Sequence, residues 1–186
     1  MAKIAETDSY IKELFDIFSS HNLADNSVVI ITSDHGDEFS EHGGLSHDGK
    51  MYCELINVPL LVYDTSSGSH TIEAPVSLID IPPTICDLMN VEPAPSFKGA
   101  SLYPLDKTQG RTLYGEAMGK IGHKEKEEDK PIYYMIEDGV KVIYRAEGDR
   151  WEAYDISSDP GETTDISKSL PEDKKDKLNS FISRNK

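Results

Sequence analysis

One short segment constrains this chain more than any other: a continuously apolar run that ends directly in a polar turn. Residues 27–32 read Ser-Val-Val-Ile-Ile-Thr, and residues 33–36 read Ser-Asp-His-Gly. A strand that is apolar on both faces is expected in the middle of a sheet that helices cover. Ligands of open α/β sheets gather beyond the carboxyl ends of such strands. The sequence therefore predicts an α/β fold with a functional site just after Thr32.

The rest of the chain divides into two predicted domains. Residues 1–108 are expected to form the α/β domain that carries the turn, and residues 109–186 a small antiparallel β subdomain with a C-terminal helix. Helical or strand patterns predict helices at residues 3–21, 82–90 and 171–182, and strands at residues 27–32, 58–63, 112–117, 131–137, 140–146 and 151–155. Asp138-Gly139 and Gly148-Asp149 are typical of hairpin turns between the late strands.

Composition excludes several kinds of partner. The formal net charge of −15 would repel nucleic acid. No run of about 18 apolar residues is present, so no membrane-spanning helix is expected. Cys53 and Cys86 have no zinc-type spacing and lie among apolar residues. They are expected to be buried free thiols, which fits a reducing cytoplasm.

The polar segment after Thr32 holds the candidate ligands. Residues 37–50 read as a loop, and loops of this length inside compact domains tend to be functional. Three histidines and four acids lie within residues 34–47. Carboxylate and imidazole groups at a strand end suit Mg, Mn or Zn, and Gly36 would let the backbone approach an anion closely. The alternative is a capped turn rich in polar residues. It is disfavoured because the cluster follows a buried strand directly.

Three stretches resemble one known family. VVIITSDHGDEFSEHGGLSHDGKMYCELINVPLLVY resembles the second metal motif of the sulfatases, within the alkaline phosphatase superfamily. VSLIDIPPTICDLMNV, followed by FKGASLYPL, resembles the family's helix and G-x-S-L segment. WEAYDISSDPGETTDI resembles its late D-P-x-E segment. The stretches occur in the family's order over nearly the whole chain. The resemblance implies part of an alkaline-phosphatase-like sheet sandwiched by helices.

Carried over residue by residue, the resemblance implies roles for five side chains. Asp34 and His35 are expected to bind a divalent metal ion, which would be Ca, Mg or Mn, with Zn also compatible. His47 is the expected catalytic residue, which would hold a sulfate or phosphate oxygen or protonate the leaving oxygen. Lys50 and His42 are the candidate substrate-binding residues, although His42 either orients the loop or only hydrogen-bonds within it.

The remaining acids of the loop are not expected to be direct ligands of the metal ion. These acids are Asp37, Glu38 and Glu41. They are expected to be solvated, or to lie behind the ligands and support them.

One departure from the family limits what the chain is expected to do. Sulfatases carry a Cys- or Ser-x-Pro-x-Arg motif whose first residue becomes formylglycine, and an early pair of aspartates that completes the metal site. Neither Cys53 nor Cys86 stands in such a motif. The chain is therefore expected to be an incomplete C-terminal part, inactive by itself and weak in metal affinity. A missing N-terminal half, or a second copy in a homo-oligomer, is expected to cover the apolar sheet edge.

Three functions follow from these residues. The leading one is metal-dependent hydrolysis of a sulfate ester of a small molecule. The second is hydrolysis of a phosphate ester or phosphonate, or phosphoryl-group transfer, in the same superfamily. The resemblance favours this reading through His35, because His rather than Asn after the aspartate is common in the Zn- or Mn-using phosphotransfer branches. The late D-P-x-E segment favours the sulfatases instead. The third is a non-catalytic module that binds a metal or an anion.

Overall fold

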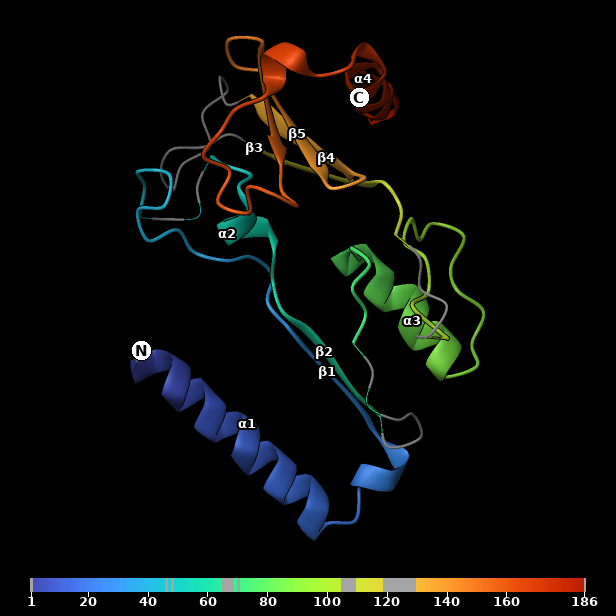
Figure 1. Cartoon of the computed structure of the whole chain (residues 1–186). Coiled ribbons are helices and arrows are strands. Elements are labelled where there is room, and N and C mark those ends of the chain that lie inside the picture. The colour runs from blue at the N-terminus through green and yellow to red at the C-terminus, as the bar shows by residue number, and fades with distance from the viewer. Residues whose placement is uncertain are drawn as a thin grey trace. The chain divides into compact units, whose positions relative to one another are not determined.

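The computed structural model describes residues 2–45, 47, 49–64, 69, 71–104, 110–118 and 130–185. The chain forms two compact units, one of residues 1–33 and 59–70 and the other of residues 34–58 and 71–186. The predicted class is confirmed, because helices combine with an antiparallel sheet and a terminal helix (Figure 1). The predicted domain boundary between residues 108 and 109 stays a prediction.

The first unit is a helix beside a pair of strands. The helix α1 (Ala2–Ser20) is followed by the short 3-10 helix η1 (Ala24–Asn26). The strand β1 (Val28–Thr32) pairs antiparallel with β2 (Leu60–Asp64). An edge-on contact joins Phe15 of α1 to Tyr63 of β2, with ring centroids 5.0 Å apart. None of the helices that the structure describes is both long and apolar enough to cross a membrane.

The position of β1 differs from the expectation of a central, covered strand. Within the described residues its only paired neighbour is β2, and the side chains of residues 28–31 are half-buried rather than buried. A pair of strands with one neighbouring helix cannot cover both of its faces. Leu61 on β2 is accordingly 57% exposed. A partner that covers this surface stays a prediction.

The second unit is built on a four-stranded antiparallel meander. Its strands are β3 (Leu113–Met118), β4 (Pro131–Glu137), β5 (Val140–Arg145) and β6 (Arg150–Asp155), which pair in that order. The predicted turn residues join them, because Asp138 and Gly139 have φ of 52° and 74°, and Gly148 and Asp149 have φ of 74° and 49°. Two successive left-handed residues match the twist of adjacent antiparallel strands. The four predicted late strands are thus confirmed.

Both faces of this sheet are covered. The helix α4 (Glu172–Arg184) packs against β4 and β5. The core on that side consists of Tyr133, Met135, Val142, Ala153, Leu170, Leu178 and Ile182. The core on the other side consists of Met51, Ile132, Ile143 and Tyr154. Neighbouring strand residues point to opposite faces, so the full burial of both Val142 and Ile143 marks β5 as an inner strand.

A buried aspartate organises the segment around α3 (Ile81–Leu88), which follows the 3-10 helix η2 (Leu78–Asp80). The Asp80 carboxylate accepts hydrogen bonds from the Ser77 and Ala100 amides, both at 2.8 Å, and pairs with Arg111. It therefore ties the start of the helix to the later segment of the chain. Pro82 and Pro83 fit this position, because the first turn of a helix needs no amide donors.

Acid stability should depend on Glu137, which joins β4 to α4. Its carboxylate accepts hydrogen bonds from Lys177 (2.8 Å), Thr112 (2.7 Å) and Lys174 (3.1 Å). These donors, Lys177 first, lower the pKa of Glu137 from 4.5 to about 2. A carboxyl group whose pKa is lower in the folded state stabilises the fold above its unfolded pKa. It loses that contribution as the pH falls towards the folded pKa.

The Glu137→Gln variant should therefore be less stable than the wild type at pH 7, and the difference should shrink between pH 4.5 and 2. Urea unfolding at a series of pH values measures this. The matched control is Glu172→Gln, because Glu172 is an exposed acid paired with Lys175 on α4. Identical pH profiles for the two variants would contradict the assignment.

Candidate functional site

The turn after β1 is held by a close approach between two backbone segments. The Gly36 amide donates a hydrogen bond to the Leu55 carbonyl at 2.8 Å. A Cβ atom at Gly36 would lie 2.0 Å from the Glu54 carbonyl oxygen, so only glycine fits. Glu54 and Leu55 belong to α2 (Cys53–Ile56), a single helical turn that the sequence pattern did not predict. Gly36 is thus required by the backbone of α2, a reason that the sequence alone did not reveal.

Three side chains gather in the loop that follows the turn. One ligand atom from each of His35, Asp37 and His47 lies within 4.8 Å of the other two. The His47 Nδ1 atom is 3.2 Å from the Asp37 Oδ1 atom, and the His35 and His47 rings stack with centroids 4.2 Å apart. All three side chains are 45–59% exposed. Two imidazoles and a carboxylate in this arrangement can bind a divalent ion from solvent.

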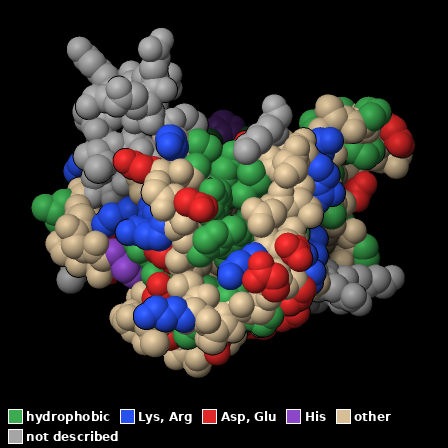
Figure 2. Space-filling view, turned by 90° about the horizontal axis from the view of Figure 1, so that it is seen from above, with side chains coloured by type: hydrophobic (Ala, Val, Ile, Leu, Met, Phe, Trp, Pro, Cys, Tyr) green, Lys and Arg blue, Asp and Glu red, His purple; other side chains and the backbone are tan. Residues whose placement is uncertain are grey.

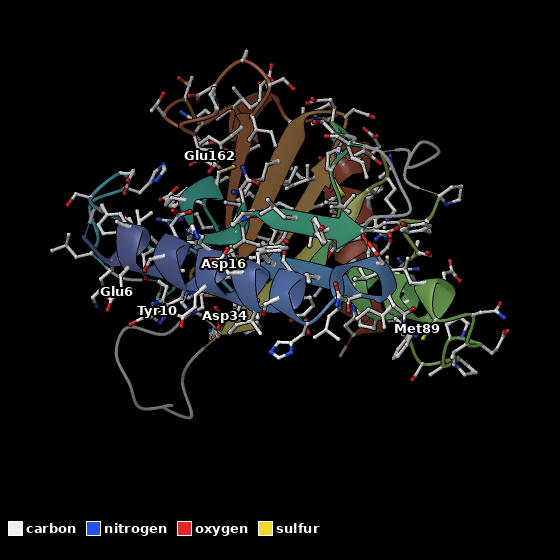
Figure 3. All side chains as sticks on the ribbon, turned by 90° about the horizontal axis from the view of Figure 1, so that it is seen from below. Glu6, Tyr10, Asp16, Asp34, Met89 and Glu162 are labelled. Carbon is white, nitrogen blue, oxygen red and sulfur yellow. The ribbon has the colours of Figure 1, made fainter. Side chains whose placement is uncertain are left out.

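The predicted ligand Asp34 lies beside this cluster rather than within it. Its Oδ2 atom is 3.7 Å from His35 Nε2, and its side chain is 86% exposed (Figure 3). The structure therefore keeps the two predicted ligands adjacent and adds Asp37, which the sequence assigned only a supporting place. The spacing of His35 and Asp37 could have revealed this, because side chains two residues apart in an extended chain point to the same side. The ligand roles themselves stay predictions.

Lys50, a predicted substrate contact, is held by a buried acid. Its ammonium lies 2.6 and 2.8 Å from the two carboxylate oxygens of Glu38, which is 2% exposed. The same carboxylate accepts hydrogen bonds from the amides of His42 (2.9 Å) and Gly44 (2.6 Å). The Lys50 ammonium holds the pKa of Glu38 below its usual value, and these two amides act in the same direction. Substrate contact by Lys50 stays a prediction.

His42 also has partners for both ring nitrogens. Its Nδ1 atom is 2.7 Å from the Glu54 carboxylate, and its Nε2 atom is 3.3 Å from the Glu162 carbonyl oxygen. The ring stacks on Tyr52 with centroids 3.7 Å apart and an interplanar angle of 10°. These contacts reach beyond the loop to α2 and to the late segment of the chain, so His42 anchors the loop. Substrate binding by His42 stays a prediction.

A buried ion pair between β5 and Glu162 holds the start of α2 in place. Lys141 on β5 and Glu162 are 2.7 Å apart, and both side chains are fully buried. The second oxygen of Glu162 accepts a hydrogen bond from the Cys53 amide at 2.5 Å, at the start of α2 (Figure 3). Sequence reasoning missed this contact, because its partners are far apart in the chain. The pair connects the sheet, α2 and the D-P-x-E segment.

Neither described cysteine forms a disulfide. Cys53 and Cys86 are free and half-buried, so the expectation of buried thiols holds only in part. Burial raises the pKa of the Cys53 thiol to about 11, although the Lys141 ammonium 3.7 Å away opposes that rise. The thiolate is the reactive form of cysteine, so the raised pKa disfavours reaction at Cys53 at neutral pH.

Comparison with known proteins gives consistent matches. The Sulfatase family model matches residues 1–91. Arylsulfatase K of Xenopus laevis is 28% identical over 92% of this chain and 33% of its own length. The N-acetylglucosamine-6-O-sulfatase of Bacteroides thetaiotaomicron is 27% identical over 89% of this chain and 31% of its own length. The chain thus spans about a third of the length of these relatives.

A solved structure agrees in fold. A 2-O GAG sulfatase superposes with a TM-score of 0.74 and 24% sequence identity, over 86% of this chain and 37% of that one. The structure bears out the fold, and the family model and the curated relatives bear out the resemblance to the sulfatases.

The buried ion pair generates a stability prediction. Lys141→Met should lower the free energy of unfolding by about 3–5 kcal/mol, because it leaves the Glu162 carboxylate buried without its cation. The double variant Lys141→Met/Glu162→Gln should recover most of this loss, since glutamine still offers an acceptor to the Cys53 amide. Urea unfolding measures both.

The matched control is Lys12→Met. Lys12 pairs with Asp16 on the exposed surface of α1, where solvent screens the two charges, so the pair contributes little to stability. A Lys141→Met loss no larger than that of the control, or a double variant as unstable as the single one, would refute the role assigned to the pair.

Proposed function

We propose, for a chain whose residues 1–91 match the Sulfatase family model, that residues 34–50 form part of a site that hydrolyses sulfuric esters. The observation that carries the proposal is the cluster of His35, Asp37 and His47, with Asp34 beside it, inside the matched segment. The side chains of these four residues are 45–86% exposed, whereas the carboxylate of Glu38, which binds Lys50 in the same loop, is buried. The substrate would be a small-molecule sulfate ester.

Asp34 and His35 would hold the divalent metal ion. A carboxylate oxygen and an imidazole nitrogen fit Mn or Zn, and the carboxylate also fits Ca or Mg. Asp37 is close enough to His35 to contribute a further oxygen. When bound, the ion supplies positive charge that stabilises the oxygens of the sulfate group.

His47 would contact the substrate. Asp37 lies at its Nδ1 atom, so the carboxylate can fix the ring orientation and hold the proton on that nitrogen. The Nε2 atom is then the one suited to hydrogen-bond a sulfate oxygen or to exchange a proton with the leaving oxygen. We favour His47 over Lys50 for this contact, because Lys50 would first have to leave the Glu38 carboxylate.

A phosphate ester or phosphonate remains the second candidate substrate. Two imidazoles, His35 and His47, lie within reach of one ion. Imidazole favours Zn or Mn over Ca. A calorimetric titration in which sulfate and phosphate compete for the Mn-loaded chain distinguishes the two substrate classes. Tighter phosphate binding would favour the second candidate. Submicromolar binding of either anion without turnover would favour a non-catalytic module.

Metal binding tests the proposed ligands directly. The wild type should bind Mn²⁺ saturably in isothermal titration calorimetry. Asp34→Asn and His35→Ala should each weaken that affinity at least about tenfold, because each removes a ligand. His47→Ala should keep most of the affinity, since it removes a substrate contact.

His21→Ala is the matched control, because His21 is an exposed histidine in the other unit. Unchanged affinity in both Asp34→Asn and His35→Ala would remove the proposed ion site. A loss in His47→Ala equal to that in His35→Ala would make His47 a ligand instead.

The 186-residue chain should not hydrolyse an aryl sulfate at a measurable rate in the presence of Ca²⁺, Mg²⁺ or Mn²⁺. Neither cysteine stands in a Cys-x-Pro-x-Arg motif, and the raised pKa of Cys53 keeps its thiol protonated. Release of the coloured phenol is the measurement. Robust turnover that disappears with a chelator would contradict the expectation that this chain lacks the nucleophile.

A further inference from the structure

The His42 ring lies between two hydrogen-bond acceptors. Its Nδ1 atom is 2.7 Å from a carboxylate oxygen of Glu54, and its Nε2 atom is 3.3 Å from the backbone carbonyl oxygen of Glu162. A neutral imidazole has one N–H group and one lone pair, so it can donate to only one of these two oxygens. An imidazolium donates from both nitrogens. The contacts of His42 therefore fit the cationic form of the ring.

Most of the charges close to His42 are paired with one another. The His42 amide donates to Glu38 and its carbonyl oxygen accepts from Lys50, and the side chains of these two residues neutralise each other. Two further pairs lie near the Tyr52 ring on which His42 stacks: Arg145 with Glu152, and Lys141 with Glu162. On the face shown in Figure 2, Lys and Arg side chains likewise lie close to Asp and Glu side chains.

Two acids whose charge acts on His42 have no lysine or arginine partner among the described residues. They are Glu54 and Asp159. The Thr164 amide holds the pKa of Asp159 below its usual value, and the charge of His42 acts in the same direction. The charge that remains unpaired around the ring is therefore negative. Negative charge at this distance favours an imidazolium over a neutral imidazole.

His42 connects the middle of the site loop to segments outside the loop. In the part of the chain that the structure describes, the pair of Glu38 and Lys50 binds only groups of the loop itself. Nearer the end of the loop, the Gly49 carbonyl accepts a hydrogen bond from Arg145 at 2.8 Å. His47 lies between these two attachments, so its place depends on the contacts of His42 as well as on those of Gly49.

We propose that Glu54 and the Glu162 carbonyl hold His42 as an imidazolium, and that this cation positions the part of the loop that carries His47. When the ring loses a proton, one of its two contacts loses its donor, and the loop loosens at that point. The loop is thus ordered at lower pH and loosened at higher pH. Glu54 is a positioning residue, because it acts through His42. The inference rests on the proposed function only for the role of His47.

The direction of the pH dependence follows from the form of the ring that the fold binds. The folded chain holds the second proton of His42 through two acceptors, and an unfolded chain does not. The folded state therefore binds more protons than the unfolded state. This contribution to stability is complete at low pH, and it is lost as the pH rises through the range in which histidine titrates.

Nitrogen-15 NMR of the histidine rings tests the protonation directly. The labelled chain is kept metal-free with EDTA and is compared at pH 7 in buffer and in concentrated urea. Both ring nitrogens of His42 should carry a proton in the folded chain, whereas the unfolded chain should show mainly the neutral ring. The spectrum of His42→Gln identifies the signal. A folded His42 with a single ring proton at pH 7 would overturn the proposal.

Cleavage by chymotrypsin measures how firmly the loop is held. Phe39 and Leu45 are 76% and 80% exposed and lie on either side of His42 in the chain, and cleavage after either requires the loop to detach locally. Relative to a reference peptide at the same pH, wild-type cleavage should increase about fivefold from pH 6.5 to 8.5, the factor expected for one lost hydrogen bond. His42→Gln should show no such increase, because glutamine does not titrate.

Glu54→Gln separates the charge of this carboxylate from its hydrogen bond. The variant keeps an acceptor for His42 but removes the negative charge, so at pH 6.5 it should be cleaved nearly as fast as the wild type at pH 8.5. It should still fold, because α2 is also held through the Leu55 carbonyl and the Cys53 amide, and urea unfolding checks this. Glu147→Gln is the matched control, since Glu147 is an exposed acid outside the loop, and it should behave like the wild type.

Two cleavage results would overturn the proposal: the same pH response in His42→Gln as in the wild type, and a Glu54→Gln variant that is cleaved like the wild type at every pH. EDTA is present throughout, and no measurement reads ester hydrolysis. Failure here would therefore leave the proposed function standing, and failure of Mn²⁺ binding would leave this inference standing.

Discussion

The ion pair between Lys141 and Glu162 is the interaction on which the candidate site depends. Two charges removed from water are stable only when each meets its partner and further hydrogen bonds. Here the second carboxylate oxygen meets the Cys53 amide at the start of α2, and the Glu162 carbonyl lies by His42. One residue of the D-P-x-E segment therefore fixes the sheet, the helical turn and the loop at once.

The polar side chains of the loop fall into two sets, one bonded to the fold and one about half exposed to solvent. Glu38, Lys50 and His42 are bonded to the fold through nearly all of their polar atoms. His35 and His47 stand on this support with about half of each side chain in solvent. A ligand site needs such a division, because groups that bind a substrate must be placed by neighbours whose own positions are fixed. The hydrogen bonds of Glu38, Lys50 and His42 thus fix the backbone of the loop that carries His35 and His47.

Much of the fold could be predicted from local sequence patterns. The features that were predicted wrongly or missed have physical causes. Helical spacing gave α1 and α4, and the Asp-Gly and Gly-Asp turns gave the meander, because both signals act within a few residues. The single turn α2 was missed, since four residues are too few to show a periodicity. The covered position expected for β1 was also not found, because apolar content describes a strand but not its neighbours.

The candidate site was predicted less completely than the fold. The adjacency of Asp34 and His35 follows from the chain itself, and the place of His47 followed from family resemblance. The approach of Asp37 to His47 depends on how the loop folds back, which no local pattern specifies. Glu162 was noticed only as part of the D-P-x-E segment, and its contacts with Cys53 and Lys141 could not be predicted, because they join segments that are remote in the sequence.

The clamp between Glu38 and Lys50 closes the intervening segment into a ring. Closure entropy grows slowly with length, by about 0.6 kcal/mol for each doubling, so such a ring tolerates insertions or deletions at its tip. His35 and Asp37 lie outside the ring and would keep their places, whereas His47 lies within it and would move. A change in the ring's length would therefore move His47 relative to His35 and Asp37, while those two residues keep their places next to β1.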